Sequence, residues 1–280
     1  TRKYLDNRRD NMGRYIKYEI KGSYKFILGV LALVLILTTG IYGYINATKE
    51  GSAFGATLVG LSTLIIFGTA LVTFLYIVGL FRKELYEDRG YLTFTLPLTG
   101  NEILGAKLIV AIIWFALLGV AIIGYNILMV AKFVPIELKF SEIFYVIDKG
   151  TILALILAFI GGVNTLILIY FSMALSRVAF RNKKIGGFWF VIFLILSAII
   201  LYGQVKIAMA LPYYIDLNTF KVGSIDTLNN YFNKNINEGL IITGNTGNDL
   251  LNIAAFIYSI IIGVLTFLGT GYLIENKIDL

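Results

Sequence analysis

The stretch FRKELYEDRGYLTFTLPLTGNEILGAK, from Phe81 to Lys107, is the only long charged segment that lies between two strongly apolar runs of this chain. Its first part, Phe81–Tyr91, combines good helix formers with charged side chains of both signs, which predicts a short helix with an apolar and a charged side. Gly90 permits a break in the chain, and Pro97 enforces a second one. The two apolar runs are therefore separate elements joined by a link that is too long to be a turn.

The composition places the whole chain in a membrane. Of its 280 residues, 58% are hydrophobic and only 15% are charged, whereas soluble domains have about 25% charged residues. The mean hydropathy is +0.81. There is no cysteine and no histidine, which removes disulfides, thiol nucleophiles, imidazole bases and the usual zinc sites. The sequence therefore predicts an integral membrane protein and argues against hydrolytic chemistry.

Six apolar runs are each long enough for the roughly 20 residues that a helix needs to cross the hydrocarbon core. They lie near residues 26–45, 58–80, 108–130, 152–175, 188–208 and 253–274. Strands of a membrane barrel would instead alternate over about ten residues. The predicted fold is an all-α membrane protein in which residues 1–280 form a single transmembrane domain of six spans.

The distribution of lysine and arginine predicts the orientation of the spans. With a cytoplasmic N-terminus, 17 of the 24 basic residues fall on the cytoplasmic side, together with both termini and the 81–107 connection. The net charge of +7 is thus a topology signal first, and nucleic-acid binding is not needed to explain it. Residues 211–252 form a long outer loop, which predicts a structure or function of its own. Tyr213 and Tyr214 in this loop suit an aromatic belt that dips back toward the membrane.

Residues 1–25 predict an amphipathic elbow helix before the first span. Its apolar residues recur every four positions, at Met12, Ile16, Ile20 and Tyr24. Its basic residues fall on the opposite side, at Arg14, Lys17, Lys21 and Lys25. This pattern is typical of a helix that lies on an anionic leaflet with its apolar face down. A solvated basic tail next to the membrane is the alternative.

On this orientation the helix predicted at Phe81–Tyr91 lies in the membrane plane at the cytoplasmic face. Thr99 and Glu102 have the spacing of a capping box, so the third span is predicted to begin after Thr99. Downstream of the fourth span, a second cytoplasmic group of basic residues is either a further docking point or a set of topology and lipid-headgroup residues. It consists of Arg177, Arg181, Lys183 and Lys184.

The order of features around the third span resembles the intracellular loop of type 2 ATP-binding-cassette (ABC) exporter permeases. A charged helix is followed by Gly-Tyr, an aromatic and threonine run, Leu-Pro, and then Gly-x-Lys-Leu where the span opens. The matching residues are Glu87, Asp88, Gly90, Tyr91, Leu92, Leu96, Pro97, Leu104, Gly105, Lys107 and Leu108. The layout of the whole chain is similar to the small bacterial permeases of this class, whose ATPase is a separate polypeptide.

The resemblance implies that two permeases, identical or related, assemble with two ABC-type ATPase subunits, which bind ATP and magnesium. It implies that the helix after the second span is a coupling helix that seats in a groove of the ATPase. The contact residues carried over are Glu84, Leu85, Tyr86, Glu87, Asp88, Arg89, Gly90 and Tyr91. Glu87 or Asp88 would pair with a basic residue of the ATPase, or with Arg14 or Lys17. The alternative is that these acids only balance neighbouring basic residues as surface pairs of little energetic value.

The chain has no GxxxxGK[ST] phosphate-binding motif, so it is not expected to hydrolyse ATP or to act as an enzyme by itself. The energy for transport would come from the partner. The resemblance implies a multi-pass protein of the bacterial plasma membrane with membrane lipids around it and no cofactor of its own.

Polar residues are scarce within the predicted spans. Asn126, Asn164 and Gln204 stand out, and they either line a translocation path or form hydrogen bonds between helices. No dense cluster of acids marks an ion path, which favours an apolar or amphipathic cargo such as a peptide antibiotic, a lipid or a drug. Two other functions stay open, an ion-coupled secondary transporter and a membrane sensor or anchor subunit that transports nothing.

Overall fold

The computed structural model describes residues 2–48, 52–87, 97–133, 149–180, 187–217, 219–224, 241–243 and 249–278. Six helices in these ranges are long and apolar enough to cross a membrane. They are α1 (Arg2–Thr48), α2 (Ser52–Tyr86), α4 (Gly100–Phe133), α6 (Lys149–Ala179), α7 (Trp189–Ala210) and α8 (Ile253–Asn276). The six predicted spans fall on these helices in order, which confirms an all-α, multi-pass membrane protein with six spans.

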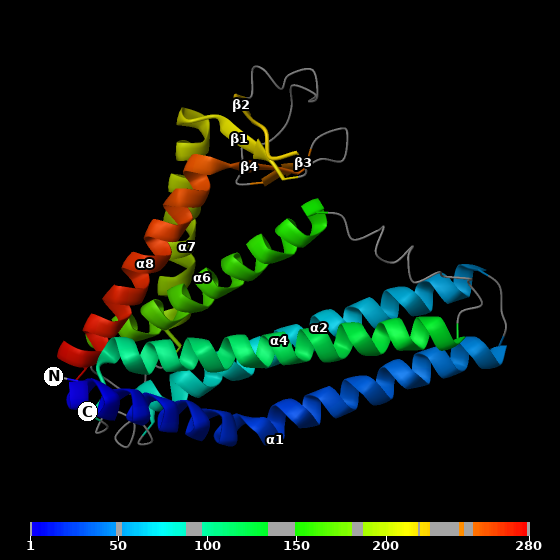
Figure 1. The fold of residues 1–280 in the computed structure, drawn as a ribbon, viewed down its shortest axis with the longest axis horizontal. Helices are drawn as coiled ribbons and strands as arrows, with labels where there is room; N and C mark the ends of the chain where they lie inside the picture. Colours follow the sequence, from blue (N-terminus) through cyan, green and yellow to red (C-terminus); the bar gives the residue numbers. More distant parts are fainter. Residues whose placement is uncertain are drawn as a thin grey trace. The chain divides into compact units, whose positions relative to one another are not determined.

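The chain divides into two compact units, residues 1–139 and 140–280. In the first, unit 1, α1 packs against both α4 and α2 (Figure 1). The side chains of α1 that are buried in this packing recur at intervals of four and seven residues, as one face of a helix requires. They are Ser23, Ile27, Val34, Thr38 and Tyr42. The core of unit 1 is thus a seam along α1, and the other faces of α1 are left open.

The amphipathic segment predicted at residues 1–25 is helical and continues into the first span without a break. Part of its apolar side is covered by protein, because Tyr15 forms a buried cluster with Ile103 and Ala106 of α4, whereas Tyr24 further along is 37% exposed. Met12, Ile16 and Leu98 pack around this cluster. The helical period predicts that the segment has an apolar face, but not which surface that face contacts. Here the start of α4 covers the part of the face at residues 12–16.

The predicted coupling helix is, over its described residues, the end of α2. Residues 81–86 continue α2, the chain bends at Glu87, and residues 88–96 lie outside the described part of the chain. α4 begins at Gly100 as predicted. The amide of Thr99 donates to Glu102 Oε2 at 2.8 Å, and the amide of Glu102 donates to Thr99 Oγ1 at 3.3 Å. These reciprocal bonds confirm the predicted capping box.

The second unit, unit 2, packs α6 against both α7 and α8, and α7 against α8 (Figure 1). Close approach depends on two glycines. A Cβ on Gly203 of α7 would lie 2.6 Å from the hydroxyl of Tyr258 on α8, and a Cβ on Gly263 of α8 would collide with the Asn164 amide on α6. Small residues let helices approach to this distance in a membrane, where dispersion contacts replace the hydrophobic effect between spans.

A four-stranded antiparallel sheet joins α7 to α8. Its strands are β1 (Tyr213–Asp216), β2 (Val222–Ser224), β3 (Ile241–Thr243) and β4 (Asp249–Asn252), in the spatial order β2-β1-β4-β3. The loop predicted at residues 211–252 therefore has a structure of its own, although its strands were not predicted. Tyr214 is buried and Tyr213 is 54% exposed, as the alternation of a strand dictates.

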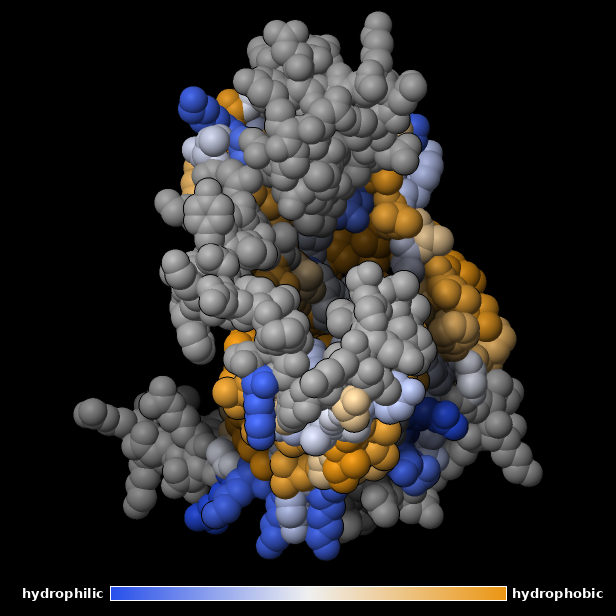
Figure 2. Space-filling model, turned by 90° about the vertical axis from the view of Figure 1, so that its right-hand side faces the viewer, coloured by the Kyte–Doolittle hydropathy of each residue, from blue (hydrophilic) through white to orange (hydrophobic). Residues whose placement is uncertain are grey.

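Large hydrophobic side chains lie on the outside of the helices. Figure 2 shows them in orange on the outer surface, and Ile36, Phe67 and Val120 are each more than two-thirds exposed, at 71%, 67% and 75%. In water such a surface would aggregate. In a bilayer it faces lipid tails, which is the environment that six spans imply.

Candidate functional site

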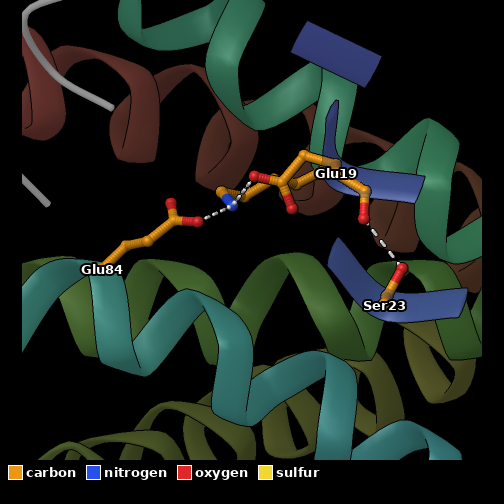
Figure 3. A network of polar contacts seen from close by, with 4 residues as sticks. Glu19, Ser23 and Glu84 are labelled. Atoms are coloured by element: carbon orange, nitrogen blue, oxygen red, sulfur yellow. Dashed lines mark hydrogen bonds and ion pairs between the residues drawn. The ribbon is translucent and has the colours of Figure 1, made fainter. Parts of the chain in front are cut away.

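Three charged side chains meet in the interior of unit 1, one from each of its helices. Lys107 Nζ of α4 lies 2.7 Å from Glu84 Oε1 of α2 and 3.1 Å from Glu19 Oε1 of α1 (Figure 3). The three side chains are only 4%, 13% and 11% exposed, in the order Lys107, Glu84, Glu19. We call this group the ion triad.

The surroundings of the ion triad are apolar and aromatic. Lys107 Nζ lies 5.7 Å from the ring centroid of Tyr15 and 6.0 Å from that of Phe81, at the limit for a cation–π contact. Phe81, Leu85 and Leu104 are almost fully buried around it. In such surroundings a charge is held only by direct partners, because desolvation is not offset by water. Each helix thus depends on the other two to keep its charged side chain inside.

The charges of the ion triad do not balance. One ammonium group faces two carboxylates, and within the described ranges Lys107 is the only cation that forms an ion pair with Glu19 and Glu84. Removal of either carboxylate would leave an ion pair, whereas removal of the lysine would leave two buried carboxylates side by side. Lys107 is therefore the member on which the arrangement depends.

A second polar link between α1 and α4 lies one helical turn further along α1. Ser23 Oγ donates to the carbonyl of Glu19 at 2.8 Å and accepts from Trp114 Nε1 at 2.9 Å. Both side chains are buried. Because Ser23 lies one turn after Glu19 on α1 (Figure 3), the Ser23–Trp114 bond and the ion triad hold neighbouring turns of the helix against α4.

The ion triad joins both flanks of the charged connection to α1. Glu84 lies three residues before the bend at Glu87, and Lys107 lies two turns into α4, after the capping box at Thr99. The helices on the two sides of the connection are therefore linked to each other and to α1. No feature of the sequence alone predicts this, since Glu19 and Lys107 are 88 positions apart.

The predicted coupling residues occupy three different environments. Glu84 belongs to the ion triad, and Leu85 is 1% exposed, so neither presents its side chain on the surface of unit 1. Tyr86 is half-buried and Glu87 is exposed at the bend. Asp88, Arg89, Gly90 and Tyr91 lie outside the described residues. Within the described part of unit 1, Glu87 makes no ion pair with Arg14 or Lys17.

The residues predicted for a translocation path are divided between the two units. In unit 1, Asn126 Nδ2 donates to the carbonyl of Ile122 within α4 at 2.9 Å. In unit 2, Asn164 Nδ2 of α6 reaches the carbonyl of Ser259 on α8 at 3.4 Å, which matches the alternative of a bond between helices. Gln204 is half-buried on α7. A path lined by these three residues stays a prediction.

The second basic group is only partly described. Arg177 is 8% exposed at the end of α6, and the rings of Phe180 and Phe188 meet edge to face at 4.6 Å on either side of the loop that follows. Arg181, Lys183 and Lys184 lie outside the described residues. Arg177 is therefore placed inside unit 2 and not on an open docking surface.

The ion triad links three helices through one ammonium group and two carboxylates. It offers no histidine or cysteine, and no group of three potential metal ligands is found among the described residues. Comparison with protein-family models, with curated proteins and with solved structures found no match to this chain. The function must therefore be argued from the residues themselves.

Proposed function

We propose that the chain is the membrane-spanning permease subunit of an ABC exporter of type 2, driven by ATP that a separate subunit hydrolyses. The observation that carries the proposal is the charged connection between α2 and α4. Its sequence resembles the intracellular loop of such permeases, and its two flanks bear Glu84 and Lys107, which bind each other and α1. A connection that transmits the movement of an ATPase to the spans must be bound firmly to them, as it is here by the ion pairs of Glu84 and Lys107.

In the proposed mechanism, the predicted coupling residues from Glu87 to Tyr91 contact the ATPase, and its closure on ATP displaces the connection. Glu87 is exposed at the start of this segment and is available for a cation of the partner. Because the ion triad is almost fully excluded from water, the bonds at Lys107 resist separation of α1 from the adjoining ends of α2 and α4. The displacement of the connection then moves α1, α2 and α4 together, and their movement opens or closes a path for the cargo.

The remaining parts of the proposal rest on charge and hydropathy. The excess of basic residues favours a cytoplasmic location for both termini and the connection. The resemblance implies a bacterial membrane, with ATP and magnesium held by the partner. A second permease, identical or related, completes the assembly. The spans consist mainly of apolar residues, which favours an apolar or amphipathic cargo such as a peptide antibiotic, a lipid or a drug.

The decisive test is isolation of the native complex, followed by an ATPase assay. An ABC-type ATPase should co-purify with the chain, and its activity should rise when cargo is added. The double variant Glu87→Gln/Asp88→Asn should lower this stimulation without lowering expression. The matched control Glu87→Asp/Asp88→Glu keeps both charges and should retain most of it.

Three results would contradict the proposal. Transport driven by an ion gradient without any ATPase would favour a secondary transporter. An ATPase that co-purifies but never responds to cargo would favour a sensor or anchor subunit. Full stimulation in the charge-removing double variant would show that the connection is not the coupling element.

A further inference from the structure

The side of α1 that faces away from α4 carries a stripe of basic residues. Arg14, Lys17, Lys21 and Lys25 follow one another at intervals of three and four residues, which places them along one side of the helix. All four side chains are exposed. The opposite side of the same turns holds Tyr15, Glu19 and Ser23, which face the interior of unit 1.

No acidic side chain neutralises this stripe from within its own segment. Glu19 is the only acid between residues 11 and 25, and it is turned inward to Lys107. Among the described residues, none of the four basic side chains takes part in an ion pair. The ion triad therefore has a second consequence: it turns the one acid of residues 11–25 inward, so that the exposed charges of this segment are all positive.

The surface of α1 changes from cationic to apolar immediately after Lys25. Phe26 is 41% exposed, and further along the helix Leu33 and Ile36 are 56% and 71% exposed. Tyr18, at 72%, lies exposed among the basic residues. Along α1, basic residues with an exposed tyrosine are followed by exposed apolar residues. This order matches the layers of a bilayer leaflet, from the headgroups to the lipid tails.

We propose that Arg14, Lys17, Lys21 and Lys25 form a binding surface for the headgroups of anionic phospholipids, and that this surface fixes the depth of α1 in the leaflet. The apolar face of the segment is closed to lipid at Met12 and Ile16, because the start of α4 covers that part of it. The cationic stripe is exposed along the whole of this segment and is free to bind the membrane. Since four residues of one charge line a single side, anionic headgroups complement them where zwitterionic ones do not. This proposal requires no ATPase partner.

The stripe is about 17 Å long at 1.5 Å per residue, whereas the headgroup layer of one leaflet is only about 6 Å thick. Lys21 and Lys25 lie next to the apolar boundary and are closest to the phosphates, and Arg14 is the most distant. The contributions to lipid binding should therefore fall from Lys25 toward Arg14.

The test uses the full chain, purified in a neutral detergent and titrated with phosphatidylglycerol or phosphatidylcholine of the same acyl chains. Native mass spectrometry counts the bound lipids. The wild type should bind phosphatidylglycerol in preference. The quadruple variant Arg14→Gln/Lys17→Gln/Lys21→Gln/Lys25→Gln should bind it about tenfold more weakly or worse, since each cation near the surface contributes severalfold in affinity.

A matched control removes the same number and kinds of charge elsewhere. It changes four exposed basic residues to Gln, namely Arg82, Lys206, Lys221 and Lys277. Its affinity for phosphatidylglycerol should stay within about twofold of the wild type. Equal loss in the control would mean that net charge, and not the stripe, binds the lipid, and would overturn the proposal.

Two double variants change fewer residues than the quadruple variant and are less prone to disturb folding. Lys21→Gln/Lys25→Gln should lose more phosphatidylglycerol binding than Arg14→Gln/Lys17→Gln, and thermal unfolding in detergent reports whether each variant is folded. Wild-type affinity in the quadruple variant, equal binding of phosphatidylcholine, or equal loss in the two double variants would each count against the surface as described.

Discussion

Lys107 carries a positive charge into an apolar part of unit 1, and the two carboxylates around it come from other helices. A single side chain thus joins the end of α2 and the start of α4 to α1. The neighbouring Ser23–Trp114 bond adds a neutral link between two of the same helices. Single substitutions in the ion triad should therefore change the stability of unit 1.

Substitution of Lys107 by Met should destabilise the chain by about 3–5 kcal/mol, because two buried carboxylates are left without their cation. Equilibrium unfolding in detergent micelles measures the change. The control Lys107→Arg keeps the charge and should cost much less. A Lys107→Met variant as stable as the wild type would mean that the ion triad is not formed in solution.

The triple variant Glu19→Gln/Glu84→Gln/Lys107→Met should be more stable than Lys107→Met alone. It removes the two carboxylates that the single variant leaves unpaired, so the desolvation cost falls. The difference between the two free energies of unfolding isolates the charge effect from the loss of packing. If the triple variant is the less stable of the two, packing and not charge explains the role of Lys107.

The helices of unit 2 approach each other closely at glycine residues, which have no side chain. Substitution of Gly263 by Ala should separate α6 from α8, because a Cβ there collides with the Asn164 amide. Gly161 on α6 is a matched control, since no atom lies within 4 Å of the position of its Cβ. We expect a destabilisation of about 1–3 kcal/mol for Gly263→Ala and none for Gly161→Ala, measured by thermal unfolding. Equal effects would show that α6 and α8 do not approach at this glycine.

Asn252 connects three elements. It ends β4 and caps α8, where its Oδ1 accepts from the amide of Ala255 at 2.8 Å. Its Nδ2 donates to the carbonyl of Leu211, just after α7, at 3.1 Å. Asn252→Ala should destabilise unit 2 by about 1–3 kcal/mol. Asn252→Asp keeps the cap but loses the donor, so an intermediate loss in unfolding experiments is expected, and a neutral Asn252→Ala would contradict the assigned role.

At the scale of the whole molecule, six spans require that the α2–α4 connection and the sheet lie on opposite sides of the membrane. The chain has no cysteine, so single cysteines can be placed on a clean background. Glu87→Cys and Lys17→Cys should react with an impermeant maleimide only after lysis, whereas Val222→Cys on β2 should react in intact cells. Labelling of Glu87→Cys from outside would overturn the orientation and the proposed function with it.

Much of this fold was predictable from local features. Hydropathy summed over about 20 residues locates the six spans, and the capping box at Thr99 and Glu102 marks the start of α4, because both signals depend on residues close together in the chain. The candidate site was only half predictable. Glu84 was expected to contact a partner, yet it is buried against Lys107, and a charged residue near a span end has the same local pattern in either case.

By itself, then, the sequence determined that this protein is a six-span helical membrane protein, since crossing a membrane is a property of each apolar run alone. Only the tertiary structure decided that the apolar side of residues 12–16 is covered by α4, that β1 to β4 form a sheet, and that Glu19 and Glu84 share Lys107. These arrangements join residues far apart in the chain, such as Glu19 and Lys107, which are 88 positions apart. The period of a helix predicts which residues share a face but not which surface that face contacts.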